Sequence, residues 1–112
     1  MNLRRWDIAF LRIDDKDPTG HPAVVLSGSN TLSDPKQLRF NVLVGTKKTP
    51  AISAADHQVV LNGADGLEFL TLLDCSLVYV ARKTSVIRLA GTVSAERRTA
   101  ISRKVRAYLG LG

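Results

Sequence analysis

The sequence predicts a mainly β domain, a small barrel or sandwich, that ends in one α-helix. Short apolar segments recur about every ten residues and are separated by turn-forming residues, which is typical of strands joined by turns. Hydrophobic residues make up 45% of the 112 residues, which is enough for one packed core. Near the C-terminus the apolar spacing changes to the helical period. We therefore expect a single domain over residues 1–112.

The N-terminal half is expected to hold three strands. Residues 6–13 alternate loosely between polar and apolar side chains, and residues 38–44 return to the same character. Residues 23–26 are wholly apolar, as in a strand buried on both faces. The intervening residues 14–20 and 27–36 are rich in Asp, Ser, Gly and Pro and are predicted to be loops.

The second half continues the pattern after a predicted loop at residues 47–56. A strand at residues 57–61 ends at Asn62-Gly63, the strongest short turn signal in the chain. Three more strands are expected, at residues 69–73, 77–81 and 86–91.

The final segment is predicted to be a helix that begins after Ser94 and stops at Gly110. Serine is a favoured N-cap, and glycine commonly follows the last helical turn. Four apolar side chains share one helical face through their i, i+4, i+7 and i+8 spacing: Ile101, Val105, Tyr108 and Leu109.

The net charge of +6 is typical of a protein that binds polyanions, although acidic protein partners also attract basic domains. Part of this charge lies on the predicted helix, where it forms either a solvated face or a nucleic-acid contact. The aromatic side chains sit mostly in apolar patterns and are interpreted as core or interface. The basic helix residues are Arg97, Arg98, Arg103, Lys104 and Arg106.

The lone Cys75 excludes an internal disulfide and is expected to be a buried thiol. No zinc-ligand spacing exists, because His21 and His57 are far apart and no second cysteine is present. No apolar run approaches the roughly 18 residues that span a bilayer. We expect a cytoplasmic protein with no membrane association, no metal and no cofactor.

Four separated segments resemble the MazF/PemK toxin family in order and spacing. Residues 5–8 (Arg-Trp-Asp-Ile) resemble its Arg-Gly-Asp-Ile strand start, and residues 21–27 (His-Pro-Ala-Val-Val-Leu-Ser) its Arg-Pro-Ala-Leu-Val-Val-Ser segment. Residues 42–46 resemble a strand that ends in a functional threonine. Residues 87–94, with the helix ending at residues 108–111, resemble the C-terminal third of the family.

This resemblance implies a small SH3-like β-barrel of the CcdB/PemK type with a C-terminal α-helix. It implies a homodimeric type II toxin–antitoxin toxin: a metal-independent endoribonuclease that cuts single-stranded RNA and is inhibited by an antitoxin protein. The alternative is a non-catalytic relative of the same fold that binds RNA or a protein partner.

The position of the family's catalytic arginine is occupied by His21, and that of its threonine by Thr46. Metal-free RNA cleavage needs a proton acceptor, a cation for the phosphorane charge and a donor that orients the phosphate. Three interpretations of His21 follow: a catalytic imidazole, an RNA-binding residue, or an ordinary loop residue before a proline. The predicted catalytic residues are His21 and Thr46.

Lys47 and Lys48 follow Thr46, so that this loop offers phosphate one hydroxyl and two ammonium groups. With Arg12 they are the predicted RNA-binding residues; the alternative is a turn and a solvated basic loop. Residues 74–81 depart from the family's Cys-Asp-Gln-Ile-Arg-Thr-Val-Asp, since Val78 replaces an arginine and Ala81 the final aspartate. Only Asp74 is left to inherit an acid or base role there.

Overall fold

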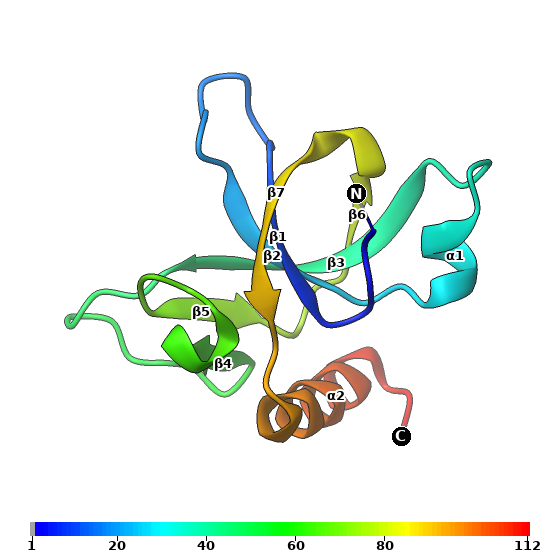
Figure 1. Ribbon diagram of the computed structural model, residues 1–112. Helices are drawn as coiled ribbons and strands as arrows, with labels where there is room; N and C mark the ends of the chain where they lie inside the picture. The colour runs from blue at the N-terminus through cyan, green and yellow to red at the C-terminus, as the bar shows by residue number, and fades with distance from the viewer. Residues whose placement is uncertain (1) are drawn as a thin grey trace.

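Strand β3 (Arg39–Lys47) organises the fold by pairing with three other strands. The computed structural model describes residues 2–112, and Figure 1 shows β3 crossing the whole molecule. The seven-stranded antiparallel sheet has the order β4-β5-β3-β2-β1-β7, and β6 also pairs with β3. The remaining strands are β1 (Asp7–Leu11), β2 (His21–Val25), β4 (Gln58–Leu61), β5 (Thr71–Asp74), β6 (Tyr79–Arg82) and β7 (Val86–Thr92).

The pairing of β3 bends the sheet. One edge of β3 pairs with β2, while the other edge is divided between β6 along residues 39–42 and β5 along residues 45–47. Within the described residues the outer strands β4 and β7 do not pair with each other, so the sheet curls without closing. The predicted mainly β fold with a C-terminal helix is confirmed, in the form of an open barrel.

Two hydrophobic clusters lie on opposite faces of the central strands. Ile8 and Phe10 of β1 belong to the first cluster, and the alternating Ala9 and Leu11 belong to the second. This two-sided burial explains why residues 23–26 read as continuously apolar, since a strand covered on both faces has no polar side. Helix α2 (Ala95–Leu109) covers the first cluster through the buried Ile101.

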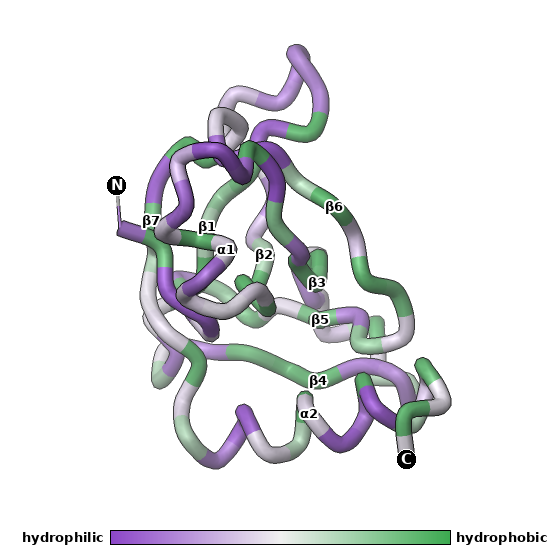
Figure 2. Tube along the Cα trace, turned by 90° about the vertical axis from the view of Figure 1, so that its right-hand side faces the viewer, coloured by the Kyte–Doolittle hydropathy of each residue, from purple (hydrophilic) through white to green (hydrophobic). Residues whose placement is uncertain are grey.

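The predicted helix is confirmed at both ends. Ser94 occupies the N-cap position of α2, and Gly110 ends the helix in the left-handed conformation with φ 70°. The Ser94 hydroxyl does not cap the helix; it accepts a hydrogen bond from Arg97. In Figure 2 the trace of α2 alternates between hydrophilic and hydrophobic residues, as expected for a helix with one buried face.

One expectation for the connecting segments was wrong, because helix α1 (Ser29–Ser33) lies within the segment expected to be a loop. The turn expected at Asn62-Gly63 is confirmed: β4 ends at Leu61, Asn62 caps the 3₁₀-helix η1 (Gly63–Asp65), and the Asp65 carboxylate accepts from the Asn62 N–H. A second 3₁₀-helix, η2 (Lys83–Ser85), leads into β7. Over residues 2–112, none of the helices has the length and apolar character needed to cross a membrane.

The buried carboxylate of Asp65 ties η1 to α2. Its oxygens accept hydrogen bonds from the N–H groups of Asn62 and Ser94 and pair with Arg97 Nη1 at 3.1 Å. The adjoining Gly66, at φ 91°, lies against Gly91 of β7; a Cβ on Gly91 would come within 2.2 Å of the Asp65 carbonyl oxygen. This close approach requires glycine at position 91.

Candidate functional site

Three of the predicted site residues line one cavity. His21 begins β2, Thr46 and Lys47 end β3, and all three lie on the wall of a cavity of about 470 Å³. The strand register explains this placement. Ala23 pairs with Val44, so continuing the same antiparallel register by two residues brings His21 opposite Thr46.

His21 has a carboxylate partner in the loop that precedes it. The Nδ1 atom of His21 is shielded from solvent and lies 2.7 Å from Oδ2 of Asp17. An N–H bond on Nδ1 would not point straight at Oδ2, so the two atoms are in close contact without the angle of a regular hydrogen bond. Oδ1 of Asp17 accepts hydrogen bonds from the Thr19 hydroxyl and the Gly20 N–H, both at 3.1 Å. Asp17, Thr19 and Gly20 also line the cavity.

An arginine from β7 lies on the same cavity. Arg88 pairs with Phe10 in the β1–β7 register, and its guanidinium carbon lies 4.0 Å from the centre of the Phe10 ring. Stacking on an aromatic face suits a guanidinium and fixes its plane. The cavity wall therefore carries a permanent cation from a strand that supplies none of the predicted site residues.

Lys47 lies over another aromatic ring of this cavity. Its Nζ is 5.1 Å from the centre of the Phe69 ring, and Phe69 is 38% exposed. Glu68 lies next to Phe69 on the wall and brings a carboxylate to this rim. The cavity thus combines an imidazole, a hydroxyl, two cations and an accessible aromatic face.

The structure separates two other predicted RNA-binding residues from this cavity. Lys48 lies outside its wall, and its ammonium group donates to the Thr49 carbonyl at 3.4 Å. Arg12 lies at a different hollow of about 520 Å³, beside the exposed side chains of Tyr79 and Val80.

The segment at residues 74–81 does not contribute to the cavity. Asp74 accepts hydrogen bonds from the N–H and hydroxyl of Ser76, which shapes the turn after β5. Cys75 is fully buried, and this burial raises the pKa of its thiol to about 11, so the thiol stays neutral at physiological pH. The prediction of a buried thiol is confirmed.

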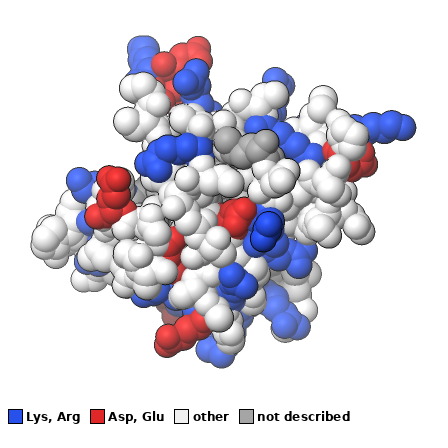
Figure 3. Space-filling view, viewed as in Figure 1, with Lys and Arg blue, Asp and Glu red and all other residues white. Residues whose placement is uncertain are grey.

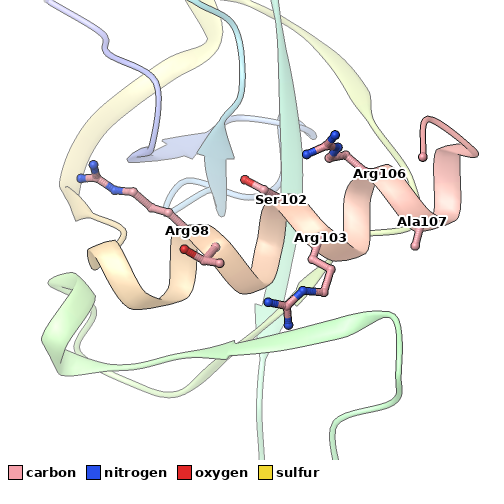
Figure 4. A pocket seen from close by; sticks show the side chains of 7 residues that line it. Arg98, Ser102, Arg103, Arg106 and Ala107 are labelled. Carbon is pink, nitrogen blue, oxygen red and sulfur yellow. The ribbon is translucent and has the colours of Figure 1, made fainter.

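Most of the basic side chains of α2 have structural partners. Arg97 and Arg98 donate to the carbonyls of Val60 and Val93, and Lys104 donates to that of Asp56. A hollow of about 550 Å³ lies along α2, and Figure 4 shows Arg98, Arg103 and Arg106 splayed along it without converging. Basic side chains also spread over the face in Figure 3 and form no single patch there. This arrangement favours the interpretation of a solvated helix face.

Sequence reasoning missed Asp17, Arg88 and Phe69 as parts of the cavity. Arg88 is a single charge within the apolar segment 86–91, and Asp17 precedes His21 by four residues in a polar loop. Arg88 could not be placed near His21 without the strand register, since β7 lies far from β2 in the sequence. Asp17 is close to His21 in the sequence, but an aspartate in a polar loop does not by itself indicate a site.

Comparison with solved structures identifies the architecture. An endoribonuclease from a mycobacterial species, solved in complex with its cognate antitoxin, superposes with a TM-score of 0.78 at 13% identity, over 98% of this chain and 97% of that chain. This chain has the MazF fold. The Mycobacterium tuberculosis toxin MazF-mt6 gives a TM-score of 0.75 at 14% identity, over 93% of this chain and 96% of that one.

A third match to the MazF fold comes from a MazE–MazF crystal structure of Deinococcus radiodurans, with a TM-score of 0.76 at 14% identity over 98% of both chains. No protein-family model and no curated protein matches the sequence. The fold predicted from the four sequence segments is thus confirmed by shape, at an identity too low to transfer residue roles.

Proposed function

We propose that this protein is a type II toxin–antitoxin toxin, a metal-independent endoribonuclease that cuts single-stranded RNA. The observation that carries the proposal is the cavity itself. This cavity gathers His21, Thr46, Lys47 and Arg88. It lies on the MazF fold, and other proteins with that fold are an endoribonuclease and a toxin. These side chains supply the proton acceptor, phosphate-orienting donor and cations that metal-free cleavage requires.

Each residue has a distinct role in the proposed reaction. His21 accepts the proton of a ribose 2′-hydroxyl, whose oxygen attacks the adjacent phosphorus. The bond from phosphorus to the 5′-oxygen breaks, this oxygen takes up a proton, and a 2′,3′-cyclic phosphate remains. Thr46 donates to a phosphate oxygen, while Lys47 and Arg88 balance the additional negative charge of the phosphorane. Arg88 thereby supplies the guanidinium that the MazF-like motif lacks at position 21.

We further propose that the protein is a cytoplasmic homodimer inhibited by an antitoxin protein. The hollow beside β6 supports the dimer, because Tyr79 and Val80 expose 46% and 64% of their surface there. Similar folds have been solved with MazE or with a cognate antitoxin, which supports such a partner. Lys48, which follows the cavity residue Lys47, is proposed as an additional contact to the bound RNA. Arg12 lines the hollow assigned here to the dimer, so the predicted RNA contact of Arg12 is not part of this proposal.

Cleavage of a long single-stranded RNA in the presence of EDTA tests the proposal. We expect wild type to give discrete fragments with 2′,3′-cyclic phosphate ends. His21→Ala should lose cleavage by a factor on the order of 10² to 10⁴, because the proton acceptor is gone. The matched control is His57→Ala, since His57 packs edge-on against Tyr108 and lies outside the cavity.

Two outcomes would contradict the proposal. Intact RNA with a measurable binding shift would identify the non-catalytic relative that binds RNA. Cleavage of the same size in His21→Ala and wild type would remove His21 from the reaction.

A further inference from the structure

The loop at residues 12–20 holds the Asp17 carboxylate in one place. Both hydrogen bonds to Oδ1 come from residues two and three positions later, so the loop itself fixes the carboxylate. The other oxygen, Oδ2, is left to face His21 Nδ1 at 2.7 Å. Gly20, at φ 78°, makes the turn between them, and a Cβ there would come within 2.7 Å of the Leu11 carbonyl oxygen.

The protonation state of this pair follows from its chemistry. Partial burial would raise the pKa of Asp17, but the hydrogen bonds from Thr19 and Gly20 and the close imidazole of His21 together lower it below its usual range. The carboxylate is therefore ionised at neutral pH and can only accept a hydrogen bond. A carboxylate that can only accept, at 2.7 Å from Nδ1 of His21, favours the tautomer with hydrogen on Nδ1 and a free lone pair on Nε2.

We propose that Asp17 is the positioning residue of a carboxylate–imidazole pair, which fixes the His21 tautomer so that Nε2 accepts the 2′-hydroxyl proton. This inference rests on the proposed function and adds a residue to it. Asp17 also stabilises the imidazolium that forms when Nε2 takes the proton. The proton then leaves to solvent or to the 5′-oxygen, so the pair returns to its starting state and consumes nothing.

The alternative role of Asp17 is a surface ion pair that holds the loop. The side chains of Asp17 and His21 are 23% and 44% exposed, and exposed pairs at this spacing contribute little to stability. A purely structural pair therefore predicts that its removal changes neither folding nor the chemical step. A positioning role predicts a loss in kcat without a loss of fold.

Steady-state cleavage of an RNA oligonucleotide by Asp17→Asn separates these roles. We expect kcat to fall by about tenfold or more, KM to change by less than about threefold, and the melting temperature to stay within about 2 °C of wild type. Asp15→Asn is the matched control: it removes the same charge from the same loop, and Asp15 lies outside the cavity that contains His21. Unchanged kcat in Asp17→Asn would overturn the inference.

A second measurement does not depend on cleavage. Two-bond ¹H–¹⁵N correlation spectra of the free protein, recorded where the imidazole is neutral, report which ring nitrogen carries hydrogen. We expect the Nδ1–H form of His21 in wild type and in Asp15→Asn. Asp17→Asn should show the tautomer mixture of a free imidazole, with His57 unchanged as the internal reference.

The two measurements distinguish the failures. A tautomer that is the same in wild type and Asp17→Asn overturns this inference while leaving the nuclease intact. A wild-type protein that cleaves no RNA overturns the proposed function, and with it the catalytic role of Asp17, whatever the spectra show.

Discussion

At the scale of single residues, the proposed reaction divides two tasks between two side chains. An imidazole can accept and release a proton, whereas an arginine stays protonated throughout. In this proposal His21 transfers the proton and Arg88 supplies the permanent charge, and the position of Arg88 on the Phe10 ring holds its guanidinium in place. The proton-transfer group and the cation therefore come from different strands, β2 and β7.

Substitution of Arg88 tests this division. We expect Arg88→Ala to reduce kcat for RNA cleavage by a factor on the order of 10² to 10³, because the phosphorane loses a preorganised cation. Arg88→Lys should recover part of the rate through its charge alone. Arg103→Ala is the control, because it removes the same charge from α2, outside the cavity. An equal loss of kcat in Arg103→Ala would mean that the net charge of the protein, and not the position of Arg88, determines the rate.

At the scale of elements, the buried Asp65 links its own segment, η1 and the end of β4, to the start of α2 at Ser94, 29 residues later. Its carboxylate accepts hydrogen bonds from the N–H groups of Asn62, after β4, and Ser94, before α2, and it forms a salt bridge with Arg97 of α2. Arg97 also donates to the Val60 carbonyl of β4. A buried carboxylate is stable in the ionised form only when such partners are present. This cluster, and not the Ser94 hydroxyl, sets the position where α2 begins.

Removal of this carboxylate should lower stability strongly. We expect Asp65→Ala to reduce the free energy of unfolding by about 3 kcal/mol, because Arg97 and two N–H groups lose their partner. Urea denaturation followed by circular dichroism measures this difference. Asp15→Ala, in an exposed loop, should change the same quantity by less than about 0.5 kcal/mol, and equal effects would contradict the structural role of Asp65.

The sequence predictions were accurate where local periodicity determines an element and missed what depends on pairing between distant strands. Periodicity predicted the strands and the helix, but it ended the third strand at residue 44, whereas β3 continues to Lys47 by pairing with β5. That pairing is non-local, so no local pattern reports it. For the same reason the motifs at residues 21–27 and 42–46 could indicate His21 and Thr46, whereas Arg88 reaches the cavity only through the β1–β7 register.

At the scale of the whole molecule, the net charge is +6, and on the face shown in Figure 3 the basic side chains are spread out and form no single patch. Such a distribution attracts RNA over long range without fixing its register, so positioning is left to the cavity. In the proposed function, the charge therefore serves the encounter with RNA and the cavity serves its orientation.

RNA affinity should therefore depend on salt. We expect the dissociation constant for a single-stranded RNA, measured with a cleavage-deficient His21→Ala protein, to rise steeply between about 50 and 200 mM salt. Lys47→Ala should reduce the slope of log Kd against log salt concentration by about 1, the change expected when one contact to phosphate is lost. A dissociation constant that does not change with salt would contradict an electrostatic encounter.

The double use of one edge of β3 has a consequence during synthesis. Strands β1 to β3 form an antiparallel meander that is complete once residue 47 has been made, but the partners of the free edge of β3 come from β5 and β6. A nascent chain that has reached residue 47 therefore presents an unpaired nine-residue edge until residue 82 has followed. Arg39 and Lys47 stand at the two ends of that edge, and charged side chains on an edge strand disfavour the addition of another chain, so we expect the lysine that lines the cavity in the folded protein also to oppose aggregation of the unfinished chain.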